Sequence, residues 1–149
     1  ALCAEASSSM PAKCIEELKG PSGKMTAEEK IALCKGARST TPAKCAVSAP
    51  TTLDAGLRAK LCARTTSSKA PAACFKETRN ALRDELLQVE FCAGAVDDGP
   101  AKCVTAAPFN LENKLKVGLC RGARDDGPAE CVKAIQSLRY GSSLGAPGE

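Results

Sequence analysis

Histidine and tryptophan are absent from this 149-residue chain, and aromatic residues make up only 3% of it. Without histidine, the usual general base, the Ser-His-Asp and Cys-His arrangements and any Cys/His zinc site are excluded. The sequence also lacks a C-x-x-C pair, a P-loop and a G-x-G-x-x-G loop, which removes the common thiol-redox and nucleotide motifs. We therefore expect no catalytic residues, no metal, no cofactor and no enzymatic activity.

Signals for membranes, nucleic acids and N-linked glycans are missing as well. No run reaches the roughly 20 apolar residues of a membrane span, and the absence of a leader pattern suggests a mature form beginning at Ala1. The net charge is only +4, and basic residues are interspersed with acidic ones, which argues against a nucleic-acid partner. The Ser/Thr-rich stretches at 39–42 and 65–68 predict turns, with O-linked glycans as the alternative.

Large apolar side chains are scarce, whereas cysteine is abundant. Hydrophobic residues make up 44% of the chain, but many of them are alanine, ten are cysteine and only three are phenylalanine. A core of small side chains buries little apolar area, and the stabilisation from burial scales with that area. Ten cysteines supply another source of stability as disulfides. We therefore expect a secreted, extracellular protein, with an organelle lumen or an intermembrane space as alternative oxidising compartments.

A Pro-Ala-x-Cys step occurs five times, and each copy is preceded by another cysteine. Ten residues separate the two cysteines in four copies and eleven in the third, and the first cysteines advance by 31, 28, 30 and 28 residues. A bulky apolar residue precedes each first cysteine, and alanine follows it by three positions in four copies: Ala6, Ala37, Ala95 and Ala123. The unit Φ-C-x-x-A-x4-P-A-x-C, with Φ apolar, has the period of a two-helix repeat.

Each unit predicts a helix, a turn and a second helix. In the second copy, Thr26 and Glu29 form a capping-box pattern at the start of a helix that ends near Gly36. Proline suits the start of the next helix because its φ is already helical and its missing N–H is not needed there. We expect such starts at Pro11, Pro42, Pro71, Pro100 and Pro128. We expect each first cysteine to bond the second cysteine of its own unit, in the pairs Cys3–Cys14, Cys34–Cys45, Cys62–Cys74, Cys92–Cys103 and Cys120–Cys131.

Acidic residues gather at two turns and on three helical segments. The fourth and fifth copies carry Asp-Asp-Gly-Pro, where aspartate favours a turn and complements the positive end of a helix. A calcium site is the alternative, although two adjacent aspartates lack the alternating ligands of a calcium loop. The acid pairs at 16–17, 28–29 and 84–85 predict solvated helix faces and are acid–base candidates only in an enzyme.

The repeat predicts an all-α, solenoid-like array of five short helical hairpins, each stapled by one disulfide. We expect a single repeat domain over 1–141 and a flexible tail over 142–149. The units are expected at about 1–25, 26–51, 52–79, 80–109 and 110–141.

One helix is expected to be longer than the others. The stretch from 71 to 93 has no proline or glycine after its first residue, and its apolar face recurs at helical spacing: Phe75, Thr78, Leu82, Leu86 and Val89. We expect one continuous helix there, and helices of about 7 to 12 residues elsewhere.

The stapled hairpin resembles the coiled-coil–helix–coiled-coil–helix proteins of the mitochondrial intermembrane space, in which twin C-x9-C motifs join two antiparallel helices by two bridges. This chain differs in its spacing of ten or eleven residues and in the proline before each second cysteine. Its tandem L-C-x2-A…P-A-x-C units, which cover nearly the whole chain, are also similar to cysteine repeats in secreted algal and protist proteins. That resemblance implies a secreted repeat protein and no particular activity.

Two functions fit these features. The first is a non-catalytic structural, scaffold or linker protein, including one that forms filaments, whose partners are other protein subunits or copies of itself. The alternative is a carrier of a small molecule or lipid, with an apolar groove between helices near Phe75, Leu82 and Phe91. An enzyme would have to rely on carboxylates or lysine alone.

Overall fold

The computed structural model describes residues 8–19 and 24–144, with side chains as far as Arg139. Within these ranges the chain is all-α, as predicted, and contains no strand. The helices are α1 (Met10–Glu17), α2 (Ala27–Cys34), α3 (Thr41–Ser48), α4 (Ala55–Cys62), α5 (Ala70–Leu82), α6 (Glu85–Cys92), α7 (Gly99–Ala106), α8 (Asn113–Cys120) and α9 (Gly127–Leu144).

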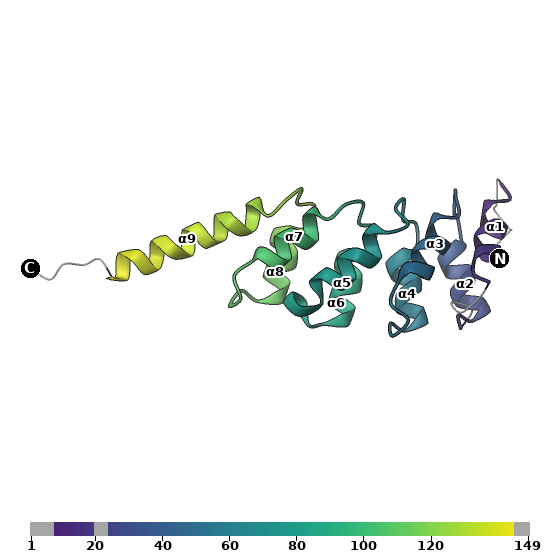
Figure 1. Cartoon of the computed structure of the whole chain (residues 1–149), viewed down its shortest axis with the longest axis horizontal. Coiled ribbons are helices and arrows are strands. Elements are labelled where there is room, and N and C mark those ends of the chain that lie inside the picture. The colour runs from purple at the N-terminus through teal and green to yellow at the C-terminus, as the bar shows by residue number, and fades with distance from the viewer. Residues whose placement is uncertain (1–7, 20–23, 145–149) are drawn as a thin grey trace, which may run out of the picture.

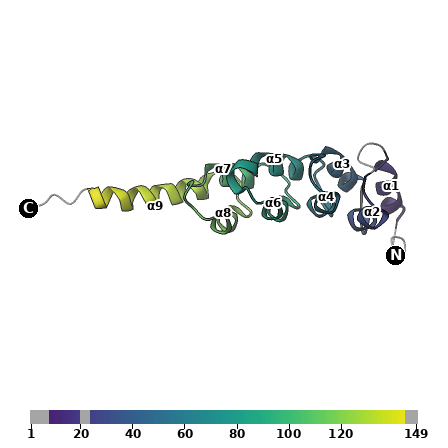
Figure 2. The ribbon, with the colours of Figure 1, turned by 90° about the horizontal axis from the view of Figure 1, so that it is seen from below.

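The helices form an elongated array with α1 and α9 at opposite ends (Figure 1). Odd-numbered helices pack in sequence along one row, α1 on α3, α3 on α5, α5 on α7 and α7 on α9, whereas α2 packs on α4 and α4 on α6 in a second row. Figure 2 shows the two rows edge on. Most helices therefore contact a neighbour along the chain and the next helix of their own row.

Proline begins the helices of the first row. It occupies the first or second helical position of α1, α3, α5 and α7, and Pro128 is the second residue of α9. The ring fixes φ near its helical value, and the N–H it lacks would have no partner in the first turn. The helix starts predicted at the five prolines are confirmed.

Side-chain caps begin three helices of the second row. Thr26 and Glu29 form the predicted capping box at the start of α2, because each side chain accepts from the backbone N–H of the other residue. Asp54 accepts from the N–H of Gly56 at the start of α4. Asp84 accepts from the N–H of Leu87 at the start of α6. These caps satisfy N–H groups that have no partner within the helix.

The second-row helices all end in the same way, with a cysteine as the last helical residue. Two residues later the chain takes a left-handed conformation, with φ between 60° and 74°, at Gly36, Arg64, Gly94 and Gly122. The next residue then donates its N–H to the cysteine carbonyl, as Ala123 does to Cys120. Three of the four left-handed positions are glycine, which adopts positive φ without a steric penalty. We call these four turns the corners of the array.

The continuous helix predicted from 71 to 93 is wrong. α5 ends at Leu82, Arg83 takes a left-handed conformation with φ 56°, and Asp84 then caps α6. Thr78 and Leu82 are fully buried, but Leu86 is 58% exposed, because the turn rotates its side chain away from the core. A capping aspartate and a left-handed arginine thus end the helix without proline or glycine.

The C-terminal carbonyls of α5 are satisfied from two other helices. Gln88 of α6 donates its Nε2 to the carbonyls of Thr78 and Arg79 at 3.3 and 3.2 Å. From α8, Asn113 donates to Leu82, and the buried Lys116 donates its Nζ to Ala81 at 3.3 Å. The lysine charge also complements the negative end of the α5 dipole. The bonds from α8 tie two successive hairpins together, whereas those from Gln88 lie within one hairpin.

The last helix is longer than expected. α9 has 18 residues, whereas every helix except α5 and α9 has eight. It extends to Leu144 and so includes residues 142–144, which were expected to belong to a flexible tail. Residues 145–149 lie outside the described part of the chain.

Candidate functional site

Four buried disulfides join each first-row helix to the second-row helix that follows it. The bonds are Cys14–Cys34, Cys45–Cys62, Cys74–Cys92 and Cys103–Cys120, with Cα–Cα distances of 5.4–5.7 Å and sequence separations of 17–20 residues. All eight cysteines are at most 2% exposed. Each bond links the fifth residue of one helix to the last residue of the next.

The disulfide pairing predicted from the sequence is therefore wrong. The pairs 3–14, 34–45, 62–74, 92–103 and 120–131 would have joined the two cysteines of one unit, whereas each bond joins the second cysteine of a unit to the first cysteine of the next. Cys3 lies outside the described residues, and Cys131 is an exposed free thiol.

The physical reason is the antiparallel hairpin. In such a hairpin the beginning of the first helix lies beside the end of the second, so the two cysteines meet across the interface between α1 and α2 and its three equivalents. A corner instead carries the chain from one hairpin to the next. The second register was also present in the spacing, because second-to-first separations of 17–20 residues recur along the chain, although they vary more than the separations of 11 or 12 residues across the corners.

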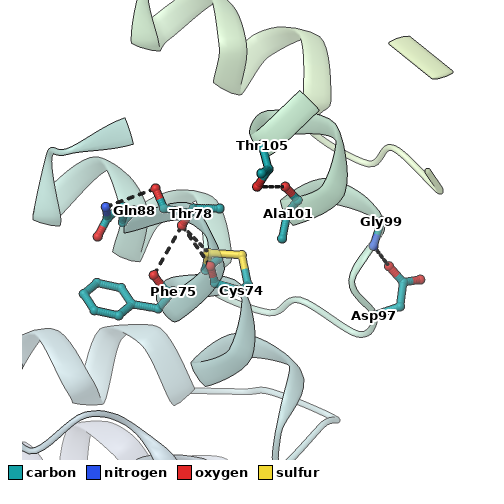
Figure 3. The surroundings of a disulfide bond; sticks show 9 residues. Cys74, Phe75, Thr78, Gln88, Asp97, Gly99, Ala101 and Thr105 are labelled. Carbon is teal, nitrogen blue, oxygen red and sulfur yellow. Dashed lines mark hydrogen bonds between the residues drawn. A yellow bond between two sulfur atoms is a disulfide. The ribbon is translucent and has the colours of Figure 1, made fainter. Parts of the chain in front are cut away.

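The surroundings of the Cys74–Cys92 bond show how closely a disulfide is enclosed (Figure 3). Thr78 donates its hydroxyl to the Cys74 carbonyl at 2.8 Å, and its Oγ1 lies 3.7 Å from the Cys92 sulfur. Thr78 is fully buried, and Gln88 donates to its carbonyl from α6. A disulfide so covered by side chains is a structural bond shielded from exchange with dissolved thiols.

The two Asp-Asp-Gly-Pro motifs form turns. Asp97 and Asp125 each accept a hydrogen bond from the glycine N–H two residues later, at 3.0 and 2.8 Å. Asp98 pairs with Lys102 at 2.8 Å on the surface. The hydrogen bond from Lys102 lowers the pKa of Asp98, and the same bond raises the pKa of Lys102. The described residues contain no group of three His, Cys, Asp or Glu side chains that could hold a metal.

The start of α9 repeats the first-row helix start, but its cysteine is left exposed. Ala129 is fully buried there, as Ala101 is in α7. Cys131 stands at the fifth helical position, where Cys103 is fully buried in its bond, yet Cys131 is exposed. Within the described residues, no second-row helix follows α9. The last unit therefore presents half of a junction, which we call the open junction.

Two surface grooves of similar size lie elsewhere on the array, and a smaller one of about 340 Å³ lies beside the end of α5, with Leu82 and Phe109 in its lining. One, of about 400 Å³, lies beside α5 and α6 and has Lys76, Arg79 and Arg83 on its rim. The other, also of about 400 Å³, runs between α2 and α4 over Ala32, Ala59 and Ala63. Phe75, Leu82 and Phe91, which were expected near a carrier groove, are all at most 8% exposed. Phe75 lines the first groove and Leu82 lines the smallest one.

The acid pairs do not form a site. Glu16, Glu17 and Glu28 are exposed, and Glu29 is engaged in the capping box. Asp84 is the cap of α6, and Glu85 is exposed beside it. The pairs therefore act as helix caps and solvated faces.

The bonded cysteines fit an oxidising compartment. In the part of the chain that the structure describes, no helix combines the length and the hydropathy that crossing a membrane requires. Comparison of the chain with protein-family models, with curated proteins and with solved structures found no match.

Proposed function

We propose that this protein is a non-catalytic structural scaffold or linker of an extracellular or lumenal assembly. It acts through its repeated helical surfaces, as solenoid-like proteins do. The single observation that carries the proposal is the open junction of α9, where Cys131 is exposed in a position that is buried and bonded in four preceding helices.

The distribution of covalent bonds supports a mechanical role. A buried disulfide closes each of the four hairpins, α1–α2, α3–α4, α5–α6 and α7–α8. A bridge that closes a loop of 17–20 residues contributes about 3 kcal/mol in the chain-entropy model. Such bonds hold an elongated array together although its core consists largely of alanine, cysteine and leucine.

A carrier of a small apolar ligand is the second candidate. It is favoured by the groove between α2 and α4, whose floor consists of Ala32, Ala59 and Ala63. Ala32 is exposed, so Ala32→Glu would place a charge in the groove without disturbing the core. A carrier would bind a fluorescent fatty acid as wild type and lose that binding in the variant. A scaffold would not bind the fatty acid in either form.

Mass spectrometry of the native particle, isolated without reductant, tests the scaffold function. A mass that exceeds one chain by whole protein subunits supports it. A bare monomer contradicts it, and a monomer with a retained small molecule favours the carrier. The same measurement reports disulfide pairing and any attached glycans.

A further inference from the structure

The open junction matches the internal junctions in its chemistry but not in its burial. In α7, Cys103 and Val104 are both fully buried, and Cys103 is bonded to Cys120 of α8. In α9, Cys131 is exposed and Val132 is only half-buried. The same pair of side chains, Cys-Val, therefore occupies the same helical positions in α7 and α9, but in α9 it is not fully buried.

A glycine at each of these two helix starts gives a second, independent sign. At Gly99, an added Cβ would lie 2.6 Å from the carbonyl carbon and oxygen of Arg124 and still closer to the carbonyl oxygen of Ala123. The corner after α8 thus packs directly against Gly99, and only a residue without a side chain leaves room for it. At Gly127, an added Cβ would meet only the flexible side chain of Asp125. Gly127 keeps the same space open, and none of the corners in the described part of the chain fills it.

The sequence contains one further copy of the element that covers such a position. Each covering element carries an apolar residue, a cysteine and, in most copies, an alanine three positions later, as in Leu119, Cys120 and Ala123. Leu2, Cys3 and Ala6 repeat this set, and Cys3 takes part in none of the four bonds, because Cys14 is bonded to Cys34.

One copy of the chain cannot close this bond on itself. α1 and α9 lie at opposite ends of the array (Figure 1), four helix-packing steps apart at about 8–10 Å each, which is more than about 30 Å. The chain from Cys3 to Met10 spans at most about 25 Å when fully extended. In a bond between Cys3 and Cys131, the two cysteines therefore belong to different molecules.

We propose that the open junction binds residues 1–7 of a second copy of this chain and is closed by a disulfide between Cys131 and Cys3 of that copy. This inference rests on the proposed scaffold function and names its partner. Because the two joined surfaces differ, the contact is head-to-tail and extends into a linear chain of molecules. Formation of the bond removes one proton and one electron from each thiol, and a small disulfide such as oxidised glutathione accepts them and becomes two thiols.

The test is oxidation of the purified full chain in a glutathione redox buffer, followed by non-reducing electrophoresis. Wild-type protein is expected to give a ladder of oligomers. Trypsin is expected to release a disulfide-linked pair of peptides, 1–13 and 125–133, each with a single cysteine. In a mixture of light and nitrogen-15 chains, mixed-isotope pairs identify a bond between two molecules.

Two single variants separate a specific junction from random thiol oxidation. Cys3→Ser and Cys131→Ser are each expected to stay monomeric, and their mixture is expected to stop at a dimer, because only one junction can form. Dimers of either variant alone, or a monomeric wild-type chain, would overturn the junction.

Gly127→Ala adds a variant that leaves both thiols in place. It is expected to slow oligomer formation about tenfold or more while the monomer keeps its stability, because the added methyl group occupies the space for the partner's corner. Oligomerisation as fast as in wild type would show that the corner does not pack there. If the oxidised chain forms no Cys3–Cys131 oligomers while the native particle still contains further protein subunits, the head-to-tail junction is refuted and the scaffold function is not.

Discussion

Gly99→Ala is expected to destabilise the array between its fourth and fifth units. An added Cβ would lie 2.6 Å from the Arg124 carbonyl group, well below the 3.0 Å that real Cβ atoms respect. The opposing atoms belong to a backbone corner that is held by the bond from the Ala123 N–H to Cys120 and by the Cys103–Cys120 disulfide. The corner therefore cannot move aside as a flexible side chain could.

The size of the effect follows from two opposing terms. Alanine in place of glycine favours a helix by up to about 1 kcal/mol, less at a terminal position. Overpacking against a rigid neighbour costs about 1–3 kcal/mol, and more where backbone has to shift. We expect a net loss of about 1–2 kcal/mol, which for a chain of this length lowers Tm by roughly 2–8 °C.

Urea unfolding of the oxidised protein, followed by circular dichroism, measures this loss. Gly127→Ala is the matched control, because it makes the same change at the equivalent helix start, where only the Asp125 side chain is near. The control is expected to be neutral or slightly stabilising. Equal unfolding midpoints for Gly99→Ala and Gly127→Ala would refute the close approach of the corner to Gly99.

Three further outcomes are expected. Replacing Cys74 and Cys92 together by serine opens an 18-residue connection and is expected to lower the free energy of unfolding in urea by about 3 kcal/mol. A loss no larger than that caused by Cys131→Ser would contradict the pairing. Lys116→Met removes the buried donor and the charge that α8 places at the end of α5. The free energy of unfolding is expected to fall by about 1–2 kcal/mol in the same assay, and an unchanged urea midpoint would count against this contact. The hydrogen bond with Lys102 lowers the pKa of Asp98, so this ion pair stabilises the fold above the usual aspartate pKa of 3.8 and the stabilisation is lost as pH falls through the lower folded value. The urea midpoint of Asp98→Asn should therefore differ slightly from that of wild type at neutral pH, and the difference should vanish in acid. A difference that grows in acid would contradict this pH dependence.

Local sequence signals predicted the helix boundaries where they act within one turn. The prolines, the Thr26 capping box and the glycines at the corners each act on their own backbone, so their structural effect is independent of the rest of the fold. The end of α5 was missed because Arg83 has no intrinsic preference for positive φ. It takes that conformation where Asp84 caps the next helix and side chains from α6 and α8 satisfy the α5 carbonyls.

The open junction could not be recognised from the sequence, because an even number of cysteines is consistent with bonds that pair every cysteine within the chain. Only the shift of the pairing by one helix leaves Cys131 exposed and Cys3 outside the four bonds. The burial contrast between Cys131 and Cys103, and the space in front of Gly127, depend on which elements pack on which. These are properties of the assembled array.

The sequence by itself determined an all-α chain of short helices, the five proline-led helix starts and the reliance on disulfides. Its period did not determine the disulfide partners, because the separations of both registers recur along the chain, at 11 or 12 residues across the corners and at 17–20 residues within the hairpins. Loop entropy does not choose between them: closing an 18-residue connection rather than one of 11 residues costs only about 0.4 kcal/mol more, less than the burial of one methylene group at about 0.8 kcal/mol. The packing of α1 on α2, and of its three equivalents, brought the two sulfurs of each bond together and so decided the register.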